Sequence, residues 1–112
     1  MSDKLESRLN ELRQLAAKYA EAEAHRQYLV EFRKSKKAML MIDAEKRGYN
    51  SSTAQEREAY AHPEYVELLE GLEIAIQDAE RLKWELRIAE AGMSVWQSLQ
   101  ANKRAEMRHL NG

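Results

Sequence analysis

The sequence predicts an all-α fold: one long antiparallel helical hairpin of the coiled-coil type, with a short kinked helix after its loop. The first observation behind this prediction is the scarcity of helix breakers, since 112 residues contain four glycines and one proline. The second is the apolar content, which is mostly Leu and Ala and therefore favours helix. The third is a charge pattern that changes sign in blocks along the chain. Together they predict a single domain over residues 1–112.

The first predicted helix covers residues 3–47, a stretch without proline or glycine. Its early apolar residues recur at steps of three and four, which is the spacing of a coiled-coil seam: Leu5, Leu9, Leu12, Ala16 and Tyr19. Small residues overlap and follow this seam and would let a neighbouring helix approach closely: Ala16, Ala17, Ala20, Ala22 and Ala24. Gly48 comes directly after the cations Lys46 and Arg47, so we expect it to end the helix as its C′ residue.

A loop over residues 48–53 separates this helix from the rest of the chain. Thr53 and Glu56 have the spacing of a capping box, in which the hydroxyl caps the helix and the acid reaches back to the backbone. This spacing predicts Thr53 as the N-cap of a short helix over residues 54–61.

Pro63 either kinks that short helix or begins a new one at its first position, with His62 as a cap or turn residue. The new helix is predicted over residues 63–109 and carries two apolar stripes. The main stripe consists of Leu72, Ile76, Ala79, Leu82, Leu86, Ala89, Met93 and Trp96, and the second of Ile74, Trp84, Ile88, Ala91 and Val95. Because a hairpin offers one helix to bury one stripe, the second stripe predicts a homo-oligomer. The expected oligomer interface comprises Ile74, Trp84, Ile88, Val95 and Trp96.

Charge favours the antiparallel arrangement of the hairpin. Residues 26–47 carry a net charge of +4 and residues 54–80 a net charge of −7, whereas residues 1–25 carry −1 and residues 81–112 carry +3. Folding at the loop sets the +4 block beside the −7 block, while a parallel dimer of straight helices would set −7 against −7. Each exposed ion pair contributes only about 0.2–1 kcal/mol, so charge selects the orientation more than it supplies stability.

No catalytic or metal-binding motif accompanies this fold. The chain has no cysteine, which excludes disulfides and thiolate metal sites, and it lacks HExxH, GxSxG and a glycine-rich phosphate loop. Glu21 and His25 are spaced to share a metal, but Zn²⁺ usually needs three or four ligands, so a solvated pair is favoured. We therefore expect a protein that is not an enzyme and that has no cofactor and no metal site. We also expect a cytoplasmic protein without a membrane partner, because no apolar run approaches roughly 18 residues and the first residues lack the apolar stretch of a signal peptide.

The densest basic run, Arg33, Lys34, Lys36 and Lys37, is the strongest local indication of function. Tyr28, Phe32, Tyr49 and Tyr60 lie nearby in sequence or across the hairpin. Single-stranded nucleic acid is bound by such cations and rings, through phosphate contacts and base stacking, so these four cations are the predicted nucleic-acid-binding residues. The alternative is that the cations pair with the acidic block opposite, residues 54–80. If they face Glu67, Glu70 and Glu73 across the hairpin, reversing their charge would weaken folding.

Several segments resemble those of a known group of proteins. They are Lys34-Ser35-Lys36-Lys37-Ala38, Ala44-Glu45, Ser52, Ala54–Ala61, Pro63-Glu64-Tyr65 and Trp96-Gln97-Ser98. Over residues 28–107 the chain is similar to small all-helical proteins of tailed bacteriophages and prophages, often encoded near genes for single-strand annealing and recombination. The resemblance implies an accessory protein of DNA recombination or replication in the host cytoplasm. Its partner would be single-stranded DNA or a phage recombination protein such as an annealing protein.

Two other classes of function stay open from the sequence. The chain can be a small phage inhibitor that blocks a host protein through the acidic face of residues 54–80, as a DNA mimic. It can also be a purely structural coiled-coil module. The salt dependence of DNA binding separates the first reading from these two, since neither of them predicts DNA binding at any salt concentration.

Overall fold

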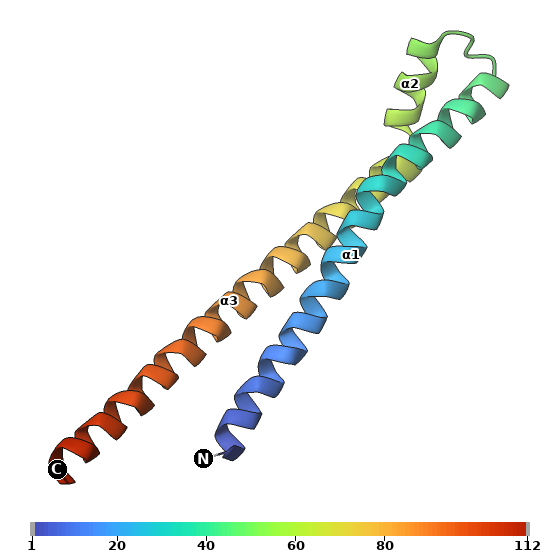
Figure 1. Ribbon diagram of the computed structural model, residues 1–112. Helices are drawn as coiled ribbons and strands as arrows, with labels where there is room; N and C mark the ends of the chain where they lie inside the picture. The colour runs from blue at the N-terminus through green and yellow to red at the C-terminus, as the bar shows by residue number, and fades with distance from the viewer. Residues whose placement is uncertain (1, 112) are drawn as a thin grey trace. The chain divides into compact units, whose positions relative to one another are not determined.

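The computed structural model describes residues 2–111 and contains three helices and no strand within that range (Figure 1). Helix α1 comprises Ser2–Lys46, α2 comprises Ser52–Ala61 and α3 comprises Pro63–Asn111. The predicted bounds of 3–47, 54–61 and 63–109 differ from these by at most two residues at any end. Helices α1 and α3 run in opposite directions and pack against each other, which confirms the predicted helical hairpin with a short helix after its loop.

The chain divides into two compact units, and both long helices contribute to each of them. The terminal unit combines α1 up to Tyr19 with α3 from Arg81 onward. The loop unit is Ala20–Glu80 and includes all of α2. Across residues 2–111, no helix combines the length and the apolar character needed to cross a membrane.

Helix α1 ends at a cap that depends on glycine. The Gly48 N–H donates to the Glu45 carbonyl oxygen at 3.0 Å, and the Tyr49 N–H donates to the Ala44 carbonyl oxygen at 3.1 Å. These two bonds form a Schellman motif, which satisfies carbonyl groups that the last turn would otherwise leave unpaired. Gly48 has a φ of 106°, the left-handed conformation that the C′ position requires. The predicted role of Gly48 is confirmed.

Helix α2 begins two residues earlier than predicted because Ser51, not Thr53, is its N-cap. The Ser51 hydroxyl oxygen accepts a hydrogen bond from the Ala54 N–H at 3.1 Å. Thr53 lies inside the first turn, and the Glu56 carboxylate lies 3.0 Å from the Lys37 ammonium instead of reaching back to the backbone. The predicted capping box is therefore wrong. The physical reason is that α1 offers Glu56 a charged partner, and a charge-assisted hydrogen bond is stronger than one to a neutral amide.

His62 ends α2 and begins α3, as expected of a cap or turn residue. Its N–H donates to the Ala59 carbonyl oxygen at 3.2 Å, and its imidazole Nδ1 accepts a hydrogen bond from the Glu64 N–H at 3.0 Å. Its backbone is extended, which is the conformation that a following proline imposes. Pro63 occupies the first position of α3, where its missing N–H leaves no helical bond unmade. The chain thus changes direction at His62 and starts a new helix.

The loop unit contains the apolar cluster that joins all three helices. Leu40 of α1, Ala59 of α2 and Tyr65 of α3 are buried together, with Met41 packed against them. Ala59 is fully buried, so α2 approaches the other helices through a small side chain. The burial of Leu40 contributes roughly 1.5–3 kcal/mol. Further along α3 the buried residues of this unit are Leu72, Ala75 and Ala79.

The terminal unit has fewer buried side chains, which in its described residues are Leu82 and Met93 of α3. The half-buried residues of α1 in this unit are Arg8, Leu9, Leu12, Leu15 and Tyr19. Leu5, at 36% exposure, and Ala16 both lie outside this seam, so the predicted α1 seam is wrong at these two positions. Both positions are spaced three and four residues from Leu12 and Tyr19, and Leu15 takes the place of Ala16 because it buries a larger apolar side chain.

Two further predictions of which apolar residues are buried are wrong. Among the alanines predicted to line a close approach, Ala22 is half-buried and the other four are exposed. On α3, Ala75 is buried and Ile76 is 40% exposed, because Leu72, Ala75 and Ala79 keep the seam on one face. The other members of the predicted main stripe are buried or half-buried: Leu72, Ala79, Leu82, Leu86, Ala89, Met93 and Trp96.

Candidate functional site

A hollow lined by cations and tyrosines lies in the loop unit. Its volume is about 340 Å³, and its lining residues are Arg33, Lys34, Lys37, Tyr60 and Tyr65. Helix α1 supplies the three cations, α2 supplies Tyr60 and α3 supplies Tyr65. This basic hollow therefore contains three of the four predicted nucleic-acid-binding cations. Tyr65 is not among the aromatic residues that the sequence places near them, because its proximity depends on the turn at His62.

The two tyrosines of the basic hollow differ in exposure. Their ring centroids are 5.3 Å apart and their planes meet at 70°, an edge-to-face contact. Tyr65 is 6% exposed because it belongs to the apolar cluster, whereas Tyr60 is 44% exposed. Tyr65 thus fixes the orientation of Tyr60, and Tyr60 presents its ring to solvent.

Lys37 connects α1 to α2 at the edge of the basic hollow. Its Nζ lies 3.0 Å from the Glu56 Oε1 and 4.7 Å from the centroid of the Tyr60 ring. The Tyr60 side chain first, and the Glu56 carboxylate second, raise the pKa of Lys37 above its ordinary value. Hydrogen bonding and charge attraction from Lys37 lower the pKa of the Glu56 carboxyl. The Glu56 contribution to the first shift and the Lys37 contribution to the second mean that each of these charges stabilises the other.

The remaining predicted cations have different surroundings. Lys36 does not line the basic hollow; its Nζ lies 3.2 Å from the Glu64 Oε2 of α3. Lys34 pairs with Glu31 on its own helix at 3.3 Å, and both side chains are about 70% exposed (68% and 71%). Arg33 has no ion-pair partner within residues 2–111. Arg33 is thus the cation of the hollow with the least internal competition for an anion.

The acids that form ion pairs with these cations are Glu31, Glu56 and Glu64, not the row of Glu67, Glu70 and Glu73. That row is exposed and has no ion pair in the described part of the chain. The alternative in which the cations pair with the acidic block of residues 54–80 is thus correct for Lys36 and Lys37, and wrong only in naming that row. The reason is that α2 and the first turn of α3 lie beside residues 36 and 37, which brings acids from earlier in the block to them.

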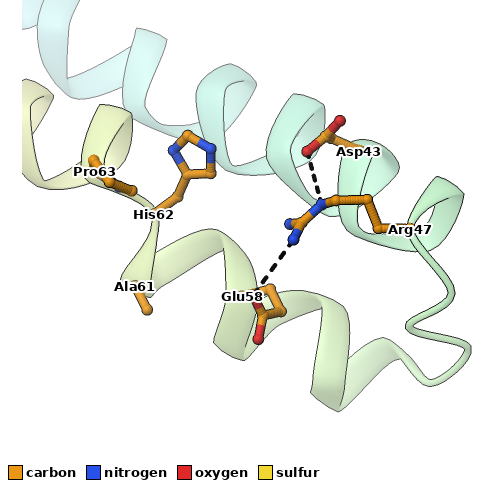
Figure 2. A pocket seen from close by; sticks show the side chains of 6 residues that line it. All are labelled: Asp43, Arg47, Glu58, Ala61, His62 and Pro63. Atoms are coloured by element: carbon orange, nitrogen blue, oxygen red, sulfur yellow. Dashed lines mark hydrogen bonds and ion pairs between the residues drawn. The ribbon is translucent and has the colours of Figure 1, made fainter.

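A second hollow, of about 390 Å³, lies beside the end of α1 and is lined by Asp43, Arg47, Glu58, Ala61, His62 and Pro63 (Figure 2). Arg47 reaches between two acids: its Nε lies 3.2 Å from the Asp43 Oδ2, and its Nη1 lies 3.9 Å from the Glu58 Oε2. The cation of this hollow is therefore already engaged by two carboxylates. We assign the arrangement a structural role, in which Arg47 holds α2 to the last turn of α1.

The predicted oligomer interface divides between two faces of α3. Four of its members are exposed at 55–69%: Ile74, Trp84, Ile88 and Val95. Trp96 is half-buried on the seam of the terminal unit, where the guanidinium of Arg8 lies 5.3 Å from its ring centroid. Trp96 therefore contributes to the hairpin of its own chain through a cation–π contact.

Comparison with known proteins leaves the chain without a matching relative. No protein-family model, no curated protein and no solved structure matches it. The similarity to proteins of tailed phages, and the function that it implies, therefore stay predictions from the sequence.

Proposed function

We propose that this chain is a phage accessory protein of DNA recombination or replication, acting in the host cytoplasm, that binds single-stranded DNA at the basic hollow. The proposal rests on one observation: the basic hollow is lined by three cations and two aromatic rings, those of Arg33, Lys34, Lys37, Tyr60 and Tyr65. Cations attract phosphates and release their condensed counterions, while aromatic rings stack on bases without selecting a sequence. These are the two requirements of single-strand binding.

Each residue of the hollow has a distinct role in this proposal. Arg33 is the main phosphate ligand, because it has no acidic partner within residues 2–111 and its planar guanidinium can donate two hydrogen bonds to one phosphate. Lys34 is the second, because an exposed pair such as Lys34–Glu31 contributes only about 0.2–1 kcal/mol and is readily exchanged. Tyr60 stacks with a base, because its ring is accessible and is held in orientation by Tyr65.

The size of the hollow limits how much of a strand it holds. At about 340 Å³ it lies at the lower end of the range of small-molecule sites. It therefore holds about one nucleotide, and the rest of a longer strand lies outside it. We accordingly expect weak binding by a single copy of the chain.

The salt dependence of binding tests the phosphate contacts. The logarithm of the affinity for a single strand falls by about 0.7 per phosphate contact for each tenfold rise in salt. The four cations predicted from the sequence would give a slope near −3, whereas the two phosphate ligands of the hollow, Arg33 and Lys34, give about −1.4, because Lys37 is engaged with Glu56 and Tyr60. We expect Arg33→Gln to make the slope less steep by about 0.7, as measured by fluorescence anisotropy with a labelled oligothymidine.

Lys36→Gln is the matched control for this measurement. Lys36 belongs to the same basic run but lies outside the hollow and pairs with Glu64, so its replacement should leave the slope unchanged. Undetectable binding by the unmodified chain in low salt would overturn the proposal. An equal effect of the Arg33 and Lys36 variants would place the DNA elsewhere on the basic run.

Replacing Tyr60 tests base stacking separately. We expect Tyr60→Ala to weaken oligothymidine binding by about 1–3 kcal/mol and to leave the salt slope unchanged, because a neutral ring contacts no phosphate. Tyr28→Ala serves as the control, since Tyr28 is also exposed, at 61%, but stacks on Phe32 outside the hollow. Equal losses in the two variants would contradict a role for Tyr60 as the stacking platform.

A second function is favoured by the acidic row of Glu67, Glu70 and Glu73. These side chains are exposed and have no ion pair in the described residues, so they are available to a basic surface. An inhibitor acting as a DNA mimic would use them to displace DNA from a host protein while itself binding no DNA. If the chain is such an inhibitor, we expect replacement of all three glutamates by Gln to abolish the displacement of DNA from the host protein. If the chain binds single-stranded DNA, the same replacement should leave oligothymidine binding intact.

A further inference from the structure

The exposed stripe of α3 in the terminal unit has the spacing of a second coiled-coil seam. Trp84, Ile88, Ala91 and Val95 are separated by four, three and four residues, and polar residues occupy the next positions of the repeat at Arg81 and Ser98. Trp84, Ile88 and Val95 are 55%, 69% and 59% exposed. The opposite seam of the same helix, which includes Leu82 and Met93, is buried against the hairpin. One helix thus carries one covered seam and one uncovered seam.

The uncovered seam is asymmetric in size. Its first half contains the large residues Trp84 and Ile88, and its second half is surrounded by the small residues Ala91, Gly92, Ser94 and Ser98. A methyl group added at Gly92 would meet nothing within 4 Å beyond its chain neighbours and the backbone of its own helix, so packing within the chain does not explain this glycine. Glycine in the middle of a helix is nonetheless destabilising relative to alanine. The second half of the seam therefore has room for large side chains from outside.

We propose that a second copy of the chain covers this seam, with α3 packed antiparallel against α3 about a twofold axis between residues 89 and 90. In that register Trp84 lies opposite Val95 of the second copy, and Ile88 lies opposite Ala91. The side chain of Trp84 enters a hole formed by four residues of the second copy: Ala91, Ser94, Val95 and Ser98. The large half of each seam thus fits the small half of the other.

Charge selects the same orientation. Residues 81–87 carry three basic side chains and one acidic side chain, a net charge of +2, and residues 88–98 carry one acid, Glu90, a net charge of −1. About the axis between residues 89 and 90, the antiparallel pair sets residues 81–87 opposite residues 92–98, which carry no charged side chain. A parallel pair in register would set +2 against +2 and Trp84 against Trp84. A second copy in antiparallel orientation is therefore the occupant that both size and charge favour.

Sedimentation equilibrium tests the assembly. We expect a dimer, and we expect Ile88→Glu to raise its dissociation constant by at least about a hundredfold, since each dimer would bury two unpaired carboxylates. Ile42→Glu is the matched control, because Ile42 is an isoleucine of α1 with 54% exposure outside the seam. A monomer at all concentrations, or equal dissociation of the two variants, would overturn the proposal.

A distance measurement tests the orientation and does not depend on how the Glu variants fold. The chain has no cysteine, so Arg104→Cys, at an exposed position of α3 beyond its last half-buried residue, Gln100, accepts a single spin label. In the antiparallel dimer the two labelled residues are separated by about 44 Å along the helix axis, at 1.5 Å per residue. In a parallel dimer they are separated only by the width of the helix pair, roughly 10–20 Å. A short distance would overturn the antiparallel assignment, and a distance of about 44 Å would establish it.

Discussion

Lys37 is the residue that links the basic hollow to the stability of the fold. Its ammonium contacts the Glu56 carboxylate and the Tyr60 ring, so one α1 side chain engages two residues of α2. The Tyr60 side chain first and the Glu56 carboxylate second raise the pKa of Lys37, and Lys37 lowers the pKa of Glu56, so the charged forms of Lys37 and Glu56 attract each other. Because Tyr60 is the proposed stacking platform, the same contact that attaches α2 also positions a ring for the ligand.

Acidification is expected to remove this contact. The pKa of Glu56 is lowered below 4.5 in the folded chain, so the stabilisation is fully present above pH 4.5 and is lost as the pH falls through the lowered pKa. The pKa of Lys37 is raised above 10.5, so its side of the contact is fully present below pH 10.5 and is lost as the pH rises through the raised pKa. We expect Glu56→Gln to lower the thermal unfolding midpoint at pH 7 and to have a smaller effect at pH 3, as followed by circular dichroism.

Glu67→Gln is the control for this comparison, because Glu67 is exposed and has no ion pair in the described residues. It should have little effect at either pH. A Glu56→Gln effect of the same size at pH 7 and pH 3 would mean that the contact stabilises α2 through packing and not through charge.

Helix α2 illustrates how a short element is held in place. Ten residues are marginal as an isolated helix, so its stability must come from its cap and its tertiary contacts. Ser51 caps its start, Ala59 is buried against the other helices, and Arg47 approaches Glu58 at 3.9 Å. The sequence predicts Thr53 as the N-cap of α2, whereas the structure has Ser51 in that role. Replacing each of these residues therefore distinguishes the two assignments.

Ser51→Ala is expected to destabilise the chain by about 0.5–2 kcal/mol, which is the usual cost of losing an N-cap hydroxyl. Thr53→Ala should change the free energy of unfolding by no more than about 0.5 kcal/mol, because Thr53 lies inside the first turn. Urea unfolding with linear extrapolation measures both. The opposite ranking would restore Thr53 as the cap.

Leu40→Ala is expected to destabilise the loop unit by about 2–5 kcal/mol, since Leu40 is 5% exposed in the cluster that joins the three helices. Met39→Ala provides the comparison on the adjacent residue, which is 50% exposed and should lose less than about 1 kcal/mol. A small effect of Leu40→Ala in urea unfolding would mean that this cluster does not hold the loop unit together.

At the scale of the whole molecule, local signals predicted the elements and missed their exact contacts. Gly48 and Pro63 mark the helix ends because each imposes a backbone conformation that depends on no distant residue. It was harder to predict which apolar residues of each long helix are buried against the other. Leu15 and Ala75 replace Ala16 and Ile76 because a continuous face decides which apolar residues are covered.

The partners of the cations could not be predicted from local signals. Block charges correctly favoured the antiparallel hairpin, but they do not specify which acid meets which base. Lys36 and Lys37 pair with Glu64 and Glu56 because of the turn at His62, a tertiary feature that also brings Tyr65 to the basic hollow. The composition of the candidate site thus depends on one junction between two helices.

Whether single-stranded DNA occupies the basic hollow is tested most directly by NMR chemical-shift mapping with an unlabelled oligothymidine in low salt. We expect the largest changes at the Arg33 guanidinium and at the rings of Tyr60 and Tyr65, which line the hollow. The indole N–H of Trp84, on the exposed seam of the terminal unit, should not move and serves as the internal reference. Changes centred on residues outside the hollow, or no change at all, would contradict the assignment of this site to DNA.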